Sequence, residues 1–165
     1  NGRKFGVSIR YLKEKEKLGT AGSLGLYRSD SDLPIVVMNG DVLSKVNLTN
    51  LLERHLKQQN CATMGIRQYD YQVPYGVVVT DGERVSRIEE KPVQSFFVSG
   101  GIYVLNQEVI EGIEPNTHLD MPTMFQSLIN RGKKVGVFPI NEYWLDIGRR
   151  DDFEKAHYDY EEVFK

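Results

Sequence analysis

The chain has 165 residues, of which 40% are hydrophobic and 27% charged, so it has the length and composition of one globular domain and not of a disordered chain. Its formal net charge of −2, with basic residues interspersed among acidic ones, argues against nucleic acid as a partner. No apolar stretch approaches the roughly 20 residues that span a membrane, so we expect no membrane partner either. Cys61 is the single cysteine, which excludes an internal disulfide and makes the cytoplasm the expected location.

The first half of the chain alternates strand and helix patterns. Residues 5–12 alternate apolar and polar side chains and are expected to form a strand. Thr20 is expected to cap a short helix that reaches about residue 28. Residues 35–38 are a short apolar run, typical of a strand buried on both faces of a parallel sheet. A helix is predicted from residue 47 to about 59, with leucines at helical spacing.

The second half contains a hairpin signal, Asp81-Gly82, between two apolar runs at residues 75–81 and 84–90. The other elements expected here are strands at 62–69, 96–105 and 135–139, a helix at 122–130 that Asp120 could cap, and a terminal helix from 150 to about 163. Together these patterns predict an α/β fold: a Rossmann-like mixed β-sheet flanked by helices, with an antiparallel hairpin insert. Residues 1–165 are expected to form one partial domain without an internal linker.

Asp41 is the first candidate for chemistry. It follows the apolar run at residues 35–38 through Asn39 and Gly40, which places it at the carboxyl end of a strand, where open α/β sheets bind ligands. A plain strand-to-loop turn is the alternative, because Asn, Gly and Asp are common turn residues.

Asp146 is the second candidate, in the segment Trp-Leu-Asp-Ile-Gly at residues 144–148. Its apolar neighbours predict a partly buried carboxylate, which needs a partner. The partner could be a backbone N–H, Arg149 or a metal ion. Mg²⁺ binds carboxylates together with phosphates and water, so two aspartates from separate strands would be enough.

Two further segments allow a structural and a functional interpretation. Small residues at 19–22 either permit a tight helix entry or present backbone groups to a planar ring. Glu89 and Lys91 lie two residues apart on one side of an extended segment. They could bind a sugar and its phosphate, or form a solvated ion pair on a hairpin arm. The sequence has no G-x-G-x-x-G motif after a strand, which argues against a dinucleotide-dependent dehydrogenase.

Four segments in this order resemble the sugar-1-phosphate nucleotidyltransferases, including members that transfer guanylyl groups to mannose-1-phosphate: residues 18–24 (LGTAGSL), 39–41 (NGD), 88–92 (IEEKP) and 144–148 (WLDIG). The similarity extends over about residues 5–156. It implies the nucleotide-diphospho-sugar transferase fold, truncated at the N-terminus, because the family opens with a strand, a Gly-rich loop and a Pro-Lys-Pro segment that this sequence does not contain. We therefore expect a fragment of a longer protein, and a homodimer through an exposed sheet edge at residues 35–38 as a possible consequence.

The resemblance also implies roles for individual residues. Asp41 and Asp146 would hold Mg²⁺ and would be catalytic together with Lys91. The implied nucleotide-binding residues are Gly19, Thr20, Gly22 and Asn39. The implied sugar-phosphate-binding residues are Gly76, Glu89, Lys91 and Ser99, where Ser99 replaces the asparagine that is usual in the family.

The implied reaction transfers a nucleoside monophosphate from a nucleoside triphosphate to a sugar-1-phosphate and releases pyrophosphate. Mg²⁺ would screen the repulsion between the phosphates. The isolated fragment is expected to be inactive. In-line transfer needs the nucleophile, the phosphorus and the leaving group to be aligned, and the missing Gly-rich loop would hold the phosphates on one side. The alternative is a non-catalytic nucleotidyltransferase-like module that binds partners.

Overall fold

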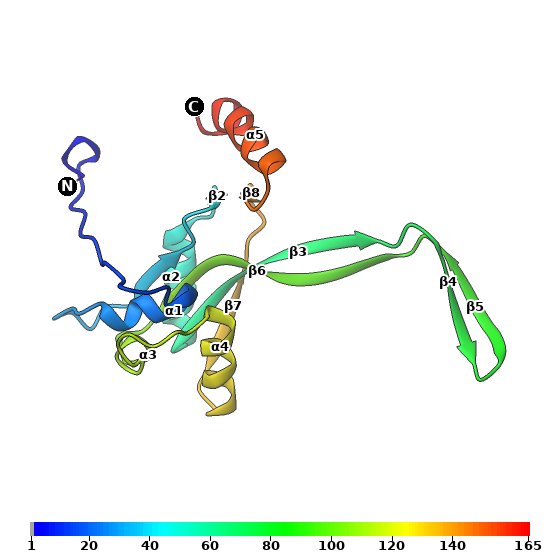
Figure 1. Cartoon of the computed structure of the whole chain (residues 1–165), viewed down its shortest axis with the longest axis horizontal. Helices are drawn as coiled ribbons and strands as arrows, with labels where there is room; N and C mark the ends of the chain where they lie inside the picture. The colour runs from blue at the N-terminus through cyan, green and yellow to red at the C-terminus, as the bar shows by residue number, and fades with distance from the viewer. Residues whose placement is uncertain (1) are drawn as a thin grey trace. The chain divides into compact units, whose positions relative to one another are not determined.

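The computed structural model describes residues 2–165, which divide into two compact units (Figure 1). The described part of the first unit comprises residues 2–40, 47–64 and 102–138, and the second comprises 41–46, 65–101 and 139–165. No helix within residues 2–165 is both long and apolar enough to cross a membrane. The two units are described separately below.

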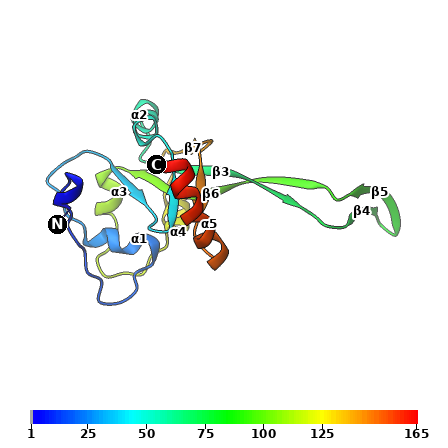
Figure 2. The same cartoon turned by 90° about the horizontal axis from the view of Figure 1, so that it is seen from above.

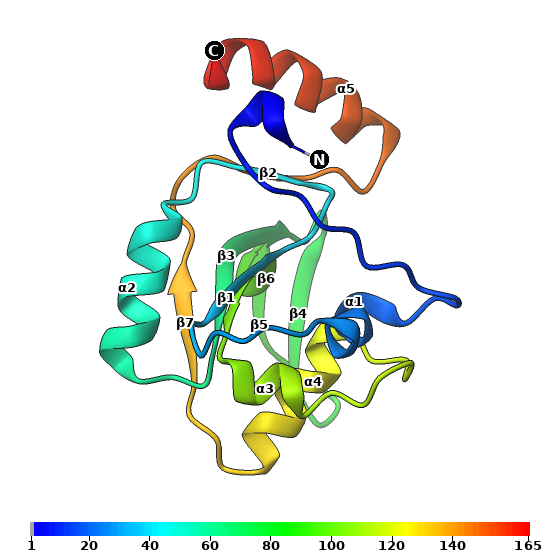
Figure 3. The same cartoon turned by 90° about the vertical axis from the view of Figure 1, so that its left-hand side faces the viewer.

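The first unit contains five short helical segments, one whole strand of a sheet and part of each of the three other strands of that sheet. Its helical elements are η1 (Arg3–Phe5), α1 with η2 (Gly19–Gly22 and Ser23–Leu26), α2 (Leu48–Gln58), α3 (Gln107–Glu111) and α4 (Met121–Asn130). Helix α2 begins as predicted, because the Asn47 side chain accepts a hydrogen bond from the Asn50 N–H. In Figure 3, α2 lies on one side of the strands, and α1, α3 and α4 lie on the other.

The sheet has four strands in the order β1-β6-β3-β7, of which β6, β3 and β7 are labelled in Figure 2. The strands are β1 (Ile35–Met38), β3 (Ala62–Gln72), β6 (Val93–Leu105) and β7 (Val135–Pro139). Strand β1 pairs antiparallel with β6, whereas the hydrogen bonds from Cys61 N to Lys134 O and from Ile140 N to Ile66 O give β3 and β7 the same direction. The predicted mixed sheet flanked by helices is therefore confirmed.

The prediction for β1 itself was only half right. Its bounds agree with the sequence, but it is not buried on both faces of a parallel sheet. It lies at the edge of the sheet, is half-buried along its length, and leaves Met38 42% exposed. An apolar run of four residues indicates a strand, but it does not specify the direction of its neighbour.

The core of the first unit lies where α3, α4 and α1 cover the strands. Its buried side chains include Tyr103, Ile110, Met121 and Phe125, and the rings of Tyr103 and Phe125 are 5.6 Å apart. Cys61 belongs to the same core, and burial raises the pKa of its thiol. It is therefore a packing residue, as small buried cysteines usually are.

The second unit contains two antiparallel strand pairs and a terminal helix. Strand β2 (Val42–Ser44) pairs with β8 (Trp144–Asp146), and β4 (Gly76–Asp81) pairs with β5 (Arg84–Glu90). The predicted hairpin is confirmed; its loop begins at Gly82, which has a φ of +59° that suits glycine. Helix α5 (Arg150–Asp159) continues into a π-helical turn, η3 (Tyr160–Phe164).

The strand expected at residues 5–12 is absent. The segment has no regular structure beyond η1, and its apolar side chains are exposed, Phe5 by 68% and Tyr11 by 82%. Alternation alone does not make a strand, because a strand also needs a partner for its backbone groups. Four elements were not predicted: η1, β2, β8 and α3, each of only three to five residues.

Candidate functional site

The pairing of β2 with β8 brings the two candidate aspartates together in the second unit. Val42 lies opposite Asp146, and the Ile147 N–H donates to the Asp41 carbonyl at 2.8 Å. Asp41 is in the turn before β2, so the strict alternation of a strand does not fix its side-chain direction. Asp41 thus lies one residue before the position opposite Asp146, and its backbone is bonded to the residue that follows Asp146.

Both aspartates are exposed, and neither side chain has a hydrogen bond or ion pair with another described residue. The expectation that Asp146 is partly buried was wrong: its side chain is exposed at the last residue of β8. Arg149 does not pair with it either; its backbone N–H instead binds the Asp152 carboxylate at the start of α5. The carboxylate oxygens of Asp41 and Asp146 are thus available to an added ligand.

The donor set fits Mg²⁺ when phosphates and water complete the coordination. Carboxylate oxygens are the protein ligands that this ion prefers, and one or two of them are usual in phosphate-transferring sites. Residues 2–165 contain no group of three or more His, Cys, Asp or Glu side chains that could hold a metal. A closed cage made only of protein ligands is therefore not the arrangement seen in the described chain.

Trp144 connects this ladder to β6. Its indole N–H donates to the Gly100 carbonyl at 2.8 Å, next to Ser99. Gly100 has to be glycine here, because an added Cβ would lie 2.6 Å from Ile140 Cδ1. The close approach of backbone and side chain thus brings the Ser99 segment to the ladder that carries Asp41 and Asp146.

Tyr143 anchors the same ladder to the terminal helix. Its carbonyl accepts from the Ser44 hydroxyl and the Lys45 N–H at 2.9 Å each, and its own hydroxyl donates to Asp159 at 2.5 Å. Burial, together with this hydrogen bond to the carboxylate, raises the pKa of Tyr143 to about 12. Its ring also meets Phe164 edge to face. Sequence analysis did not single out Tyr143, because its role depends on residues far along the chain.

The Gly19–Gly22 turn of α1 lies in the first unit, together with Asn39. The functional interpretation assumed N–H groups that are open to a ligand, but those of Thr20, Ala21 and Gly22 are already bonded. The N–H groups of Ala21 and Gly22 donate to the Leu119 carbonyl, and that of Thr20 donates to the Asp120 carboxylate at 3.2 Å. The turn is a tight helix entry packed against the chain that leads into α4.

Thr20 and Asp120 exchange the capping roles predicted for them. The Thr20 hydroxyl accepts from the Met121 N–H at 2.8 Å and thereby caps α4, while Asp120 accepts from the first turn of α1. Each side chain satisfies a free N–H of the other helix. Two glycines permit this contact. Gly19 has a φ of +76°, and a Cβ added there would lie 2.6 Å from Asp120 Oδ1. A Cβ added at Gly22 would lie 2.4 Å from the Thr117 carbonyl.

The β4–β5 hairpin carries Gly76 and Glu89, and Lys91 follows it. The sequence allowed an exposed ion pair between Glu89 and Lys91. The structure shows an exposed ion pair of Glu89, but its partner is Arg87, at 2.8 Å. Lys91 has a φ of +45°, so the extended segment assumed from the sequence ends at Glu90. Left-handed backbone is unusual for lysine and clusters at functional positions. Its carbonyl accepts a hydrogen bond from the Gln72 side chain.

The structure therefore links part of the predicted residue set. Asp41, Asp146 and, through Trp144, the Ser99 segment are connected within the second unit. Gly76, Glu89 and Lys91 belong to that unit as well, on and beside the hairpin.

The chain is similar in sequence to known proteins. The family model described as "Nucleotidyl transferase" matches residues 1–163. A mannose-1-phosphate guanyltransferase of Pichia angusta is 38% identical over 92% of this chain, and a D-glycero-alpha-D-manno-heptose 1-phosphate guanylyltransferase of Aneurinibacillus thermoaerophilus is 31% identical over 93%. The chain spans 43% of the Pichia protein and 68% of the Aneurinibacillus protein.

The fold is shared with solved structures. The crystal structure of HddC from Yersinia pseudotuberculosis superposes with a TM-score of 0.62 at 24% identity, over 89% of this chain and 64% of that one. The match of the family model over nearly the whole chain shows that this chain belongs to the nucleotidyl transferase family.

Proposed function

We propose that the protein containing this chain is a Mg²⁺-dependent sugar-1-phosphate nucleotidyltransferase, which transfers a guanylyl group from GTP to a mannose-type sugar-1-phosphate and releases pyrophosphate. The names of the two relatives support the choice of nucleotide and sugar. The observation that carries the proposal is the pair of unpartnered carboxylates, Asp41 and Asp146, at one end of the β2–β8 ladder. The cytoplasm is the proposed location, because one buried cysteine fits a reducing compartment.

In this proposal Asp41 and Asp146 would hold Mg²⁺, which neutralises phosphate charge when it is bound. Lys91 would bind the sugar phosphate as a point charge, and Glu89 and Ser99 would accept from sugar hydroxyls. Glu89 could do so without leaving Arg87, because the ion pair uses only its Oε1 and a carboxylate accepts several hydrogen bonds. The Gly19–Gly22 turn would contact the nucleotide by shape and carbonyls, since the N–H groups of Thr20, Ala21 and Gly22 are already used.

Pyrophosphate release from GTP, in the longer protein with Mg²⁺ and mannose-1-phosphate, tests the proposal. Asp41→Asn and Asp146→Asn should each lower the rate by roughly 10²-fold or more, the scale of losing one electrostatic contribution to the transition state. Asp152→Asn is the matched control, since Asp152 caps α5 and should leave the rate nearly unchanged. If no pairing of a common triphosphate with a sugar phosphate gives turnover, the proposal of an enzyme is refuted.

We expect the 165-residue chain alone to be inactive in the same assay, because it spans less than half of the Pichia relative. We also propose that this chain associates with a second copy through the edge of β1, since the outer side of that strand has no neighbour in the described sheet. Sedimentation at rising concentration measures this association, and a monomer throughout would contradict it.

A further inference from the structure

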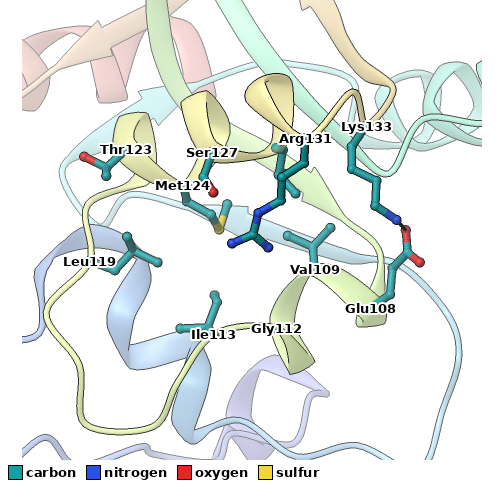
Figure 4. A pocket seen from close by; sticks show the side chains of 11 residues that line it. Glu108, Val109, Gly112, Ile113, Leu119, Thr123, Met124, Ser127, Arg131 and Lys133 are labelled. Carbon is teal, nitrogen blue, oxygen red and sulfur yellow. Dashed lines mark ion pairs between the residues drawn. The ribbon is translucent and has the colours of Figure 1, made fainter.

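A cavity of about 310 Å³ lies between α3 and α4 in the first unit, away from every residue discussed above for catalysis (Figure 4). Its floor is apolar and is formed by buried side chains of both helices and the segment between them: Val109, Ile113, Met124 and Leu128. The volume is at the small end of the range of ligand pockets, about 300–1,000 Å³. The cavity therefore has room for a compact apolar group.

Arg131 places a charge over this floor. Its guanidinium extends across the opening toward Met124 and Val109 (Figure 4). The Arg131 backbone N–H binds the Ser127 carbonyl, but its guanidinium has no hydrogen bond or ion pair with any residue in the described chain. Five N–H donors of a planar group are thus available at the mouth of an apolar cavity.

The other charges at the rim limit what could bind. Lys133 lies 3.9 Å from Glu108 Oε1, so its charge already faces a carboxylate. Glu108 would repel a second negative charge, which makes a polyphosphate a poor occupant. The Ser127 hydroxyl points into the cavity from α4 and can form a hydrogen bond with one additional polar atom of a ligand (Figure 4).

A cation near the C-terminus of α4 could also be explained by the helix dipole alone. That explanation requires only that Arg131 be near the last carbonyls. It does not account for the direction of the guanidinium, which extends over the apolar floor of the cavity although the Arg131 side chain is exposed. The combination of the cavity, its floor and the unpaired guanidinium carries the inference.

We propose that this cavity binds a small organic monocarboxylate with a compact apolar body. The carboxylate would accept two parallel hydrogen bonds from the Arg131 guanidinium, the geometry that this pair favours. The apolar body would lie on Val109, Ile113 and Met124, where its transfer from water is favourable. The proposal is independent of the nucleotidyl-transfer activity, because it uses none of that site's residues.

The test titrates 3-phenylpropanoate into the full chain and follows the methyl resonance of Met124. A saturable shift is expected with the carboxylate. The neutral amide of the same acid should bind at least about tenfold more weakly, because it lacks the charge-assisted pair. Inorganic phosphate alone should cause no shift. Equal binding of acid and amide, or no saturable shift with the acid, would overturn the proposal.

Two variants localise the binding. Arg131→Gln should weaken 3-phenylpropanoate binding about tenfold or more, whereas Arg84→Gln, on the exposed β5 strand, should not change it. Ser127→Leu should fill the cavity and abolish binding, with an unchanged melting temperature showing that the fold persists. An Arg131→Gln protein with unaltered affinity, or tighter binding of GMP than of the acid, would show that a different ligand or site is involved.

Discussion

The Gly19–Gly22 turn and the β4–β5 hairpin both carry proposed substrate contacts, yet they are held in different ways. In the turn, successive N–H groups bind the chain before α4, and Ala21 and Gly22 are buried. In the hairpin, almost every side chain is exposed, and the strands are held by each other and by the loop at Gly82. Substitutions should therefore act on stability in the turn and chiefly on ligand contacts in the hairpin.

Glycine replacement should give the largest contrast. Gly22→Val should lower the free energy of unfolding by about 3 kcal/mol, the upper part of the usual cost of overpacking, because a Cβ there would lie 2.4 Å from the Thr117 carbonyl. Gly76→Val in the hairpin should change it by less than about 0.5 kcal/mol, since its Cβ would meet only the flexible Glu90 side chain. Urea unfolding of the 165-residue chain measures both, and equal losses would refute the contrast.

A buried hydroxyl gives the second test. The Thr63 hydroxyl is within 2.9 Å of His55 Nδ1 and accepts from Asn60 Nδ2 at 3.0 Å, and all three residues are buried. Thr63→Val should cost about 2 kcal/mol, because two buried polar groups lose a partner.

Thr80→Val is the matched control on the exposed hairpin, where the same change should be nearly neutral. Thermal unfolding followed by circular dichroism compares the two variants. If Thr63→Val were as mild as Thr80→Val, the polar cluster around His55 would contribute nothing to the stability of the first unit.

Tyr143 lies between these extremes. Tyr143→Phe should cost about 1 kcal/mol, the usual net value of one hydrogen bond, here the bond to Asp159. Tyr75→Phe, at a side chain that is 74% exposed, should cost nothing measurable. Tyr143→Phe should also lower activity of the longer protein, because Tyr143 positions the ladder that carries Asp41 and Asp146.

The raised pKa of Tyr143 adds a pH dependence. The folded state holds the phenol proton more tightly than the unfolded state does, so the stabilisation is complete below the ordinary tyrosine pKa and is lost as pH rises through about 12. The unfolding midpoint of the unsubstituted chain should therefore fall more steeply between about pH 10 and about pH 12 than that of Tyr143→Phe. Parallel curves for the two proteins would contradict the assignment.

The smallest effect is expected at the exposed ion pair. Arg87→Gln removes the partner of Glu89, but both side chains are in solvent, so the free energy of unfolding should change by less than about 1 kcal/mol. The change should shrink further at high salt. A larger, salt-independent loss in urea unfolding would mean that the hairpin depends on this pair.

Local signals in the sequence predicted much of the fold. Asn47 with the leucines of α2, the loop glycine Gly82, and the apolar run of β7 each gave the correct element, because capping, turn geometry and periodicity act over a few residues. The two candidate aspartates were also found this way. The strand at residues 5–12 failed, since its alternation found no partner strand.

The sequence by itself determined which residue types are present at each position: carboxylates after β1 and in β8, small residues in α1, and a hairpin in the middle. Only the tertiary structure decided that Asp41 and Asp146 lie at one end of the same ladder, that β1 runs antiparallel to β6, and that the N–H groups of Thr20, Ala21 and Gly22 are already bound. These features join segments far apart in the chain. Strands of three residues have too few positions for a periodic signal, and a backbone N–H reveals its partner only after the chain has folded.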